Sequence, residues 1–262
     1  DADTTADAIH ALNRATGWAS FREALRRYIG PSQNFIFGDV KGTIAHITPG
    51  LIPIRKTGDG RLPVPGWDGK HDWIGYIPFD FVPQGTDPAK GFLVNANNRI
   101  VGPGYPFFLA TGWGDHYRAT RITDVLKGEA KTTPDTTAAL QGDVVSLPAR
   151  ALLPLLLPTP PGSDRERAAV GLLKAWDFRM DRHKPAPLIY AAWVYELGRA
   201  IFADELGARA AARYGGDVDV LKDILTKYPS WCDDTRTAEK ETCAMMLSRS
   251  LTAAIGRLSE DY

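Results

Sequence analysis

The first thirty residues carry apolar side chains at helical spacing, three or four positions apart. These positions are Ile9, Leu12, Ala15, Trp18, Phe21, Leu25, Tyr28 and Ile29. Thr4 or Thr5 is a suitable N-cap for a first helix, and Gly17 follows its end. Pro31 ends the pattern, because proline cannot continue a helix. The spacing therefore predicts two short helices before residue 30.

The next segments have the β-branched and aromatic composition of strands. Residues 34–40 (NFIFGDV) and 43–48 (TIAHIT) flank a short Lys-Gly link, which predicts a β-hairpin. His46 has no second ligand nearby, so it is predicted to be a core or cross-strand residue rather than a metal ligand. Residues 49–90 are rich in Pro, Gly and Trp with little periodicity, which is typical of a long binding or covering loop.

A further apolar run, residues 91–98 (GFLVNANN), ends in three carboxamides and predicts a strand. Because side chains alternate along a strand, Asn95 and Asn97 would share a face with Leu93, and Asn98 would point the other way. A carboxamide held at a strand end can donate its N–H to an oxygen that gains charge during a reaction. Alternatively, the amides only pair with loop backbone, since Asn is common at turns. Spacing alone favours this second interpretation.

The rest of the sequence is predicted to be mostly helical. Asp115 caps one expected helix, and Thr133 with Pro134 opens another. After a break at 158–162, a helix is expected from Ser163 to Trp176, followed by a largely buried helix at 187–206. Two more helices are expected at 217–228 and 238–259. The pattern predicts an α+β fold. Residues 1–112 hold a helix pair, a hairpin, sheet strands and a long loop, and residues 113–262 form a mostly helical region.

The amino-acid composition limits the classes of binding partner that the protein could have. The 262 residues include 31 Lys plus Arg and 31 Asp plus Glu, so the formal net charge is zero. Balanced charge without a basic block argues against nucleic acid or an anionic membrane as partner. No apolar run reaches the roughly 20 residues needed to span a bilayer. The most apolar stretch, residues 151–157, is short and contains Pro154. The sequence predicts a soluble protein.

Cys232 and Cys243 lie eleven positions apart in a polar segment. No further Cys or His set stands nearby, so a zinc site is not predicted. A disulfide that closes a short loop between helices is favoured over two free thiols, and it would imply an oxidising compartment.

Familiar catalytic motifs are missing from the sequence. It contains no Gly-x-Ser-x-Gly elbow, phosphate loop, His-Glu-x-x-His or dinucleotide fingerprint. The five histidines are scattered without an evident Ser or Asp partner, and the paired carboxylates at 177–183 are typical of a solvated turn. Spacing alone thus predicts an amide-lined strand end and no nucleophile to act with it.

An ordered series of motifs nevertheless resembles the penicillin acylase family of N-terminal nucleophile hydrolases. The series is NFIFGDV at 34–40, GTIAH at 42–46, RLPVPGW at 61–67, DWIGYIPF at 72–79, GFLVNANN at 91–98 and WGDHYRATRI at 113–122. It is similar to the middle of the family's β-subunit, and the later helices look like the helical part that follows. The resemblance implies part of an αββα sandwich, with antiparallel strands in the first half and a helical region after about residue 113.

The resemblance also implies roles for individual residues. In the family, a Ser at the start of the β-subunit attacks an amide carbonyl with its own α-amino group as base, and an Asn side chain and a backbone N–H hold the oxyanion. The motif places that donor at Asn97, with Asn95 bracing the strand. Arg118 matches the Arg that holds the catalytic network, although spacing alone favours an ion pair with Asp115. Gln33 falls where family members border the acyl pocket.

The family's nucleophile and backbone oxyanion donor would lie upstream of Asp1. The expectation is an internal fragment, inactive alone, of an amide hydrolase that is processed from a precursor. Its expected partners are a small-molecule N-acyl substrate, the missing α-subunit and the remainder of the β-subunit. No cofactor is expected for catalysis. The resemblance implies a structural calcium only in the complete protein, because the family binds it largely through residues outside this segment. Phe107, or a gap, stands where the family supplies an Asp ligand, and Gly60 replaces the family's proline before Arg61.

The alternative function is a non-catalytic binding or interaction module that kept the scaffold, with residues 49–90 as its recognition surface. A different amidase has no residue set in its support. The family and the expected disulfide imply a periplasmic or secreted protein, although the sequence contains no signal-peptide pattern. The acyl group, whether of a penicillin, a cephalosporin or an acyl-homoserine lactone, would be selected by pocket residues that lie mostly upstream.

Overall fold

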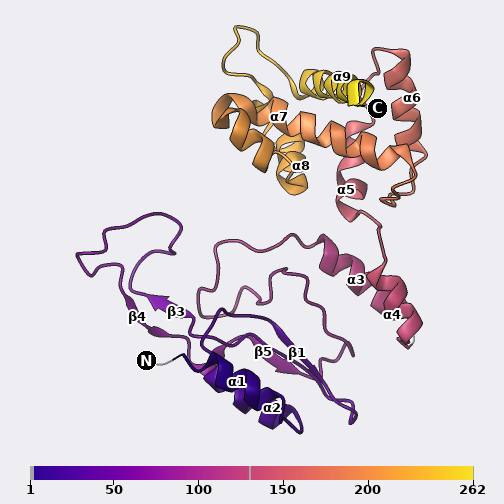
Figure 1. Ribbon diagram of the computed structural model, residues 1–262. Helices are drawn as coiled ribbons and strands as arrows, with labels where there is room; N and C mark the ends of the chain where they lie inside the picture. The colour runs from indigo at the N-terminus through magenta and orange to yellow at the C-terminus, as the bar shows by residue number, and fades with distance from the viewer. Residues whose placement is uncertain (1–2, 130, 262) are drawn as a thin grey trace. The chain divides into compact units, whose positions relative to one another are not determined.

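A computed structural model of the protein describes residues 3–129 and 131–261. The chain forms two compact units, residues 1–132 and 133–262. The change from strand to helix predicted at residues 112 and 113 lies before this division, because helix α3 (Tyr117–Gly128) belongs to the first unit. Figure 1 shows both units and labels their α-helices and most of their strands.

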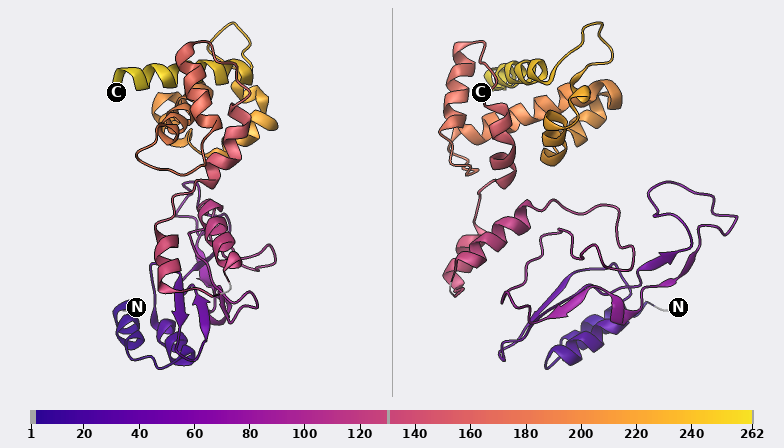
Figure 2. Two further views of the ribbon diagram at one scale, coloured as in Figure 1. Left: turned by 90° about the vertical axis from the view of Figure 1, so that its right-hand side faces the viewer. Right: turned by 180° about the vertical axis from the view of Figure 1, so that it is seen from behind.

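The first unit combines short helices with two small antiparallel sheets (Figures 1 and 2). Its elements before α3 are α1 Thr5–Leu12, α2 Trp18–Ala24, η1 Leu25–Arg27, β1 Phe35–Gly38, β2 Ile44–Ile47, β3 Pro53–Arg55, β4 Trp73–Tyr76, η2 Phe79–Phe81 and β5 Gln84–Thr86. The three-stranded sheet has the order β1-β2-β5, and the other sheet pairs β3 with β4. The predicted helix pair and the hairpin at 34–48 are confirmed.

Aromatic side chains pack the helix pair against the three-stranded sheet. The rings of Phe21 and Phe37 have centroids 5.1 Å apart, and those of Tyr28 and Phe35 are 5.2 Å apart. The fully buried core of this unit includes Leu25 and Ile47. Burial of such side chains is the main stabilising contribution to a unit of this size.

His46 is a cross-strand residue, as predicted. It lies opposite Ile36 on β1 and Gly85 on β5. Its Nε2 is 3.1 Å from Asn34 Oδ1 and 3.2 Å from Thr48 Oγ1. Burial lowers the pKa of the imidazole below its ordinary value, because desolvation disfavours the charged form.

Two predictions for the middle of the first unit are wrong. Residues 49–90 contain three strands, each of three or four residues, which is too short for an alternating pattern to be visible. Residues 91–98, predicted to be a strand, have no regular structure. Asn97 has a φ of 61°, in the left-handed region, whereas a strand needs a strongly negative φ. Alternation of side chains therefore does not place Asn95, Asn97 and Asn98.

The second unit is mostly helical. Its elements are α4 Pro134–Gln141, α5 Leu147–Leu156, α6 Asp164–Lys174, α7 Pro185–Tyr214, α8 Val218–Thr226, η3 Pro229–Cys232 and α9 Cys243–Asp261. Two predicted caps of this unit are present: Thr133 Oγ1 accepts the N–H of Thr136, and Ser163 Oγ accepts that of Glu166. The cap predicted for the first helix is not formed, because the Thr4 hydroxyl donates to the backbone oxygen of Arg27 instead. Helix α5 was missed, since Pro154 lies inside it. Helix α7 runs beyond its predicted end and is interrupted at Gly207.

Helices α7 and α9 form the centre of the second unit's core. Trp193 is fully buried there, and its indole N–H donates to Ser250 Oγ at 3.1 Å. A disulfide joins Cys232 to Cys243, the pairing that the sequence favoured, and ties η3 to the start of α9. Within residues 3–129 and 131–261, no helix has the length and apolar character to cross a membrane.

Candidate active-site turn

The three amides at residues 95–98 shape a turn in the first unit. Asn95 Oδ1 accepts the N–H of Asn97 at 3.2 Å, and Asn98 Oδ1 accepts the N–H of Ala96 at 3.1 Å. These side chains satisfy backbone donors that a strand partner would otherwise satisfy. Asn97 tolerates its left-handed φ better than most residues do. Pairing with the turn backbone thus explains Asn95 and Asn98, while the carboxamide of Asn97 has a different partner.

Arg118 on α3 is that partner. Its Nη2 donates to the backbone oxygen of Ala96 at 2.8 Å and to Asn97 Oδ1 at 3.0 Å. The ion pair with Asp115 that spacing favoured is not formed in the described chain. Asp115 Oδ1 instead accepts the N–H of Tyr117 at 2.9 Å, at the start of the helix. Arg118 therefore joins α3 to the amide turn.

The contact with Arg118 fixes which way the amide of Asn97 points. A guanidinium has donors only, so the atom of Asn97 that faces it must be the carbonyl oxygen. The Asn97 Nδ2 is then turned away from Arg118, and no described residue hydrogen-bonds to it. The side chain is exposed in this chain. The turn presents an oriented N–H donor, which is the type of group that stabilises an oxyanion.

Gly114 holds the backbone of Asn97 from the other side. Its N–H donates to the Asn97 carbonyl oxygen at 2.8 Å. A Cβ at position 114 would lie 2.9 Å from that oxygen and 3.1 Å from Asn97 Cβ, which is closer than ordinary contacts allow. Sequence reasoning missed Gly114. The signal that could have identified it is a glycine inside the WGDHYR motif, since close backbone approach is a common reason for glycine.

The other two predicted site residues, Asn95 and Gln33, make no hydrogen bond to the Asn97 or Arg118 side chains among the described residues. The Nδ2 of Asn95 is buried and has no acceptor among the described residues. Gln33 is exposed just before β1, and in residues 3–129 and 131–261 no hydrogen bond joins it to Asn97 or Arg118. The structure therefore brings Asn97 and Arg118 together, and it leaves Gln33 outside their hydrogen-bonded group.

The residues at the family's calcium positions do not suit a cation. Phe107 packs edge-on against Phe81 and Tyr105, with ring centroids 5.9 and 6.0 Å away, and it offers no oxygen ligand. At Gly60 the guanidinium of Arg55 lies alongside the backbone, and its positive charge would repel a cation there. No group of three or more His, Cys, Asp or Glu in the described chain is arranged to hold a metal.

If Asn97 supplies an oxyanion donor in a longer amide-cleaving protein, Arg118→Met should lower kcat about tenfold with little change in KM, because Asn97 would lose its fixed orientation. Arg118→Lys keeps the charge and should recover part of the loss. Lys127→Met is the control, since Lys127 is exposed in the last turn of the same helix. Steady-state kinetics on an N-acyl amide provide the measurement. A higher KM at unchanged kcat would contradict a positioning role for Arg118.

Known proteins identify the family. The penicillin amidase family model matches residues 1–262 of this chain. Acyl-homoserine lactone acylase QuiP from Pseudomonas aeruginosa is 34% identical over 280 residues, covering 97% of this chain and 33% of QuiP. Penicillin acylase 2 proenzyme from Pseudomonas sp. strain SE83 is 35% identical over 205 residues, covering 78% of this chain and 26% of that protein. The chain belongs to the penicillin amidase family, as the motif series indicated.

A solved structure agrees on the fold. Thermostable penicillin G acylase from Alcaligenes faecalis matches 98% of this chain and 52% of its own chain, with a TM-score of 0.76 and 20% sequence identity. At that identity the match shows the fold alone. The α+β class is confirmed. The chain spans about a third of the length of the curated relatives that it matches first.

Proposed function

We propose that this chain is part of an N-acyl amide hydrolase and supplies one donor of its oxyanion hole, the Nδ2 of Asn97. The observation that carries the proposal is the contact between Arg118 Nη2 and Asn97 Oδ1 at 3.0 Å. This contact uses the side-chain oxygen of Asn97 and leaves its side-chain N–H free to donate to a substrate oxygen. The small sheets of the first unit would then be parts of an αββα sandwich completed by segments outside residues 1–262.

In the proposed reaction a Ser outside this chain is the nucleophile. Its oxygen bonds to the amide carbonyl carbon while its proton passes to its own α-amino group. Asn97 donates to the negative carbonyl oxygen of the tetrahedral intermediate, and Arg118 holds Asn97 in place. The C–N bond then breaks, and the amine leaves with that proton. Water attacks the acyl ester in the same way and releases the carboxylic acid.

One further feature supports a secreted or periplasmic location, and another supports a longer protein. The disulfide between Cys232 and Cys243 suits an oxidising compartment. The buried Nδ2 of Asn95 needs an acceptor, because an unpaired buried donor costs about 1–3 kcal/mol, and segments outside this chain would supply it. The relatives matched by the sequence are acylases, which favours the hydrolase over an interaction module without catalysis.

Turnover of amide substrates tests this proposal. The full-length protein should hydrolyse a chromogenic phenylacetyl amide or a fatty-acyl amide, whereas residues 1–262 alone should hydrolyse neither, because the nucleophile lies elsewhere. Product release is followed by absorbance for both proteins at equal concentration. Turnover by residues 1–262 alone would contradict the external nucleophile. A full-length protein that binds the acyl compounds but cleaves none would favour the interaction module.

A further inference from the structure

The segment from β3 to β4, residues 53–76, forms an arm that extends from the first unit (Figures 1 and 2). Its base is anchored where Ile54 packs against the core cluster that contains Ile77, and no other residue of the arm belongs to that cluster in the described part of the chain. Among described residues, the hydrogen bonds of 56–72 stay within the arm, for example from Lys56 N to Asp72 O at 2.9 Å and from Thr57 Oγ1 to Lys70 O at 2.8 Å. The arm is internally ordered without packing its outer part on the rest of the unit.

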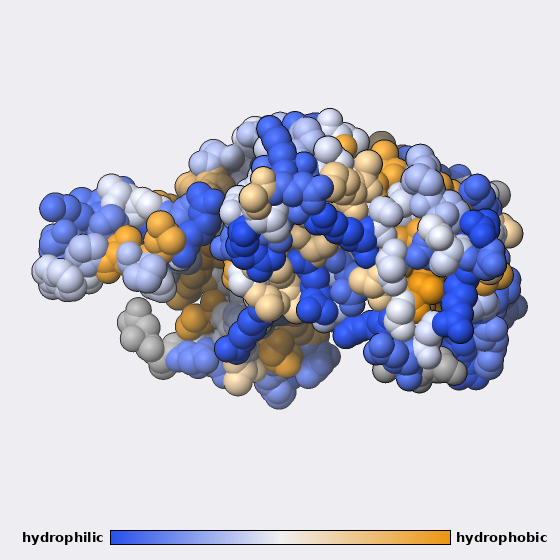
Figure 3. Space-filling view, turned by 90° about the horizontal axis from the view of Figure 1, so that it is seen from above, coloured by the Kyte–Doolittle hydropathy of each residue, from blue (hydrophilic) through white to orange (hydrophobic). Residues whose placement is uncertain are grey.

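This arm exposes large apolar side chains that a folded protein normally covers. They are Leu62, Val64, Trp67, Trp73, Ile74 and Tyr76. Trp67 is 88% exposed and Leu62 is 76% exposed. Figure 3 shows hydrophobic patches among hydrophilic ones on the arm, at the left of the view. Clustered exposed apolar residues of this kind mark interaction surfaces.

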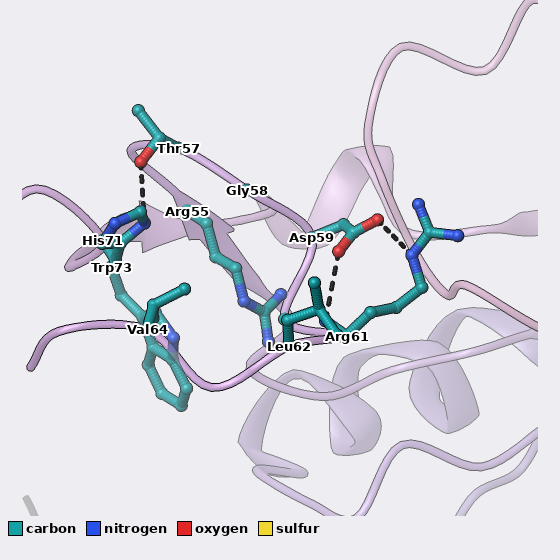
Figure 4. A pocket seen from close by; sticks show the side chains of 10 residues that line it. Arg55, Thr57, Gly58, Asp59, Arg61, Leu62, Val64, His71 and Trp73 are labelled. Carbon is teal, nitrogen blue, oxygen red and sulfur yellow. Dashed lines mark hydrogen bonds and ion pairs between the residues drawn. The ribbon is translucent and has the colours of Figure 1, made fainter.

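The arm also contains a cavity with an unbalanced positive charge. The cavity has a volume of about 550 Å³, and its lining includes Arg55, Leu62 and Trp73. Figure 4 shows the Arg55 side chain running between Leu62 and Trp73. No described residue forms a hydrogen bond or ion pair with the side chain of Arg55, whereas Arg61 is paired with Asp59 at 2.6 Å. The half-buried Arg55 guanidinium therefore has no counter-charge.

We propose that the arm, residues 53–76, is a docking surface for a segment of the same longer polypeptide outside residues 1–262. The segment brings apolar side chains onto Trp67 and Leu62 and one Asp or Glu carboxylate to Arg55. The relatives supply the reason for this occupant, since residues 1–262 span only 33% of QuiP and most of such a protein lies outside this structure. The proposal does not depend on the oxyanion role of Asn97.

The chemistry of the cavity selects the charged group. A guanidinium matches a carboxylate geometrically, with two parallel N–H···O bonds, and the pair strengthens when apolar neighbours exclude water. Leu62, Val64 and Trp73 supply those neighbours. A lysine or arginine from the incoming segment would meet like charge and would be rejected. The segment is therefore apolar with one acidic residue.

Site-specific photo-cross-linking in the full-length protein tests the occupant. A benzophenone amino acid replaces Trp67 in one variant and Val40 in a control, because Val40 is fully exposed but lies in the β1–β2 turn rather than in the arm. After irradiation, mass spectrometry identifies the joined peptides. We expect position 67 to cross-link to a peptide outside residues 1–262 that has an Asp or Glu nearby, and position 40 to yield no such product.

Charge reversal tests the role of Arg55. Arg55→Glu should reduce the cross-link yield from position 67 about tenfold, because like charges facing each other across an interface weaken association. Arg55→Lys should keep part of the yield, because the positive charge remains while the two-point hydrogen bonding is lost. Arg61→Glu is the matched control, since Arg61 is exposed and paired with Asp59, and it should change the yield little. Exchanging the identified acid for Lys should rescue the Arg55→Glu variant.

Several results would overturn the proposal. Cross-links from position 67 only to residues 133–262, only to a second copy, or at no more than the level of position 40 would exclude a segment outside this chain as the occupant. An Arg55→Glu variant with unchanged cross-linking would exclude the carboxylate. These readouts measure docking, so they are separate from the amide-hydrolysis assay.

Discussion

Replacing Asn97 with alanine in the full-length protein is expected to lower kcat by about 10²–10³, the usual effect of losing one oxyanion donor. The expected change in KM is small, because the donor acts on charge that develops only in the transition state. Asn97 is exposed and outside both core clusters, so the fold should tolerate the substitution. Steady-state kinetics, normalised to correctly processed enzyme, provide the measurement.

Asn97→Asp separates the donor from the contact with Arg118. An aspartate keeps an oxygen for the Arg118 guanidinium, which now donates at 3.0 Å, but it has no N–H and adds negative charge near the oxyanion. We therefore expect Asn97→Asp to be at least as inactive as Asn97→Ala. If either variant retained activity close to that of the unmodified enzyme, the assignment of Asn97 as the oxyanion donor would be wrong.

Gly114→Ala is expected to reduce kcat by up to about 10², although residue 114 has no side chain of its own to contribute. A Cβ there would lie 2.9 Å from the Asn97 carbonyl oxygen, so the Asn97 backbone must move. A displacement of about 1 Å at a catalytic group can cost on the order of 10² in rate. Melting temperature and KM should change much less than kcat. A crystal structure of the variant would show whether Asn97 moves.

Gly112→Ala provides the matched control for Gly114→Ala. Gly112 is two residues earlier, and a Cβ added there would meet nothing within 4 Å. It should leave kcat and stability close to those of the unmodified protein. If Gly112→Ala and Gly114→Ala had the same kinetic effect, the close approach to Asn97 would not be the cause.

Local signals in the sequence predicted the helices well. Thr133 and Ser163 are caps because their hydroxyl oxygens accept N–H groups three residues ahead, which is a relation visible in sequence. Helix α5 was missed because Pro154 normally argues against a helix, and burial of Leu152, Leu153 and Leu156 outweighs that cost here. The pairing of Cys232 with Cys243 followed from the lack of any other partner.

The strand prediction at 91–98 failed for a different reason. The apolar residues suggested alternation, but Asn95 and Asn98 satisfy the backbone of a turn, and Asn97 adopts a left-handed φ. Propensity patterns describe average surroundings, and a turn stabilised by its own side chains overrides them. The short strands β3, β4 and β5 were missed because pairing, rather than composition, creates them.

The sequence by itself determined the α+β class, most helix starts and the family, because capping, periodicity and ordered motifs act over a few neighbouring residues. Only the tertiary structure decided the geometry of the candidate site. Arg118 reaches the amide of Asn97 across 21 positions, and Gly114 approaches its backbone from another segment. Such contacts depend on how distant segments pack, which no local pattern encodes.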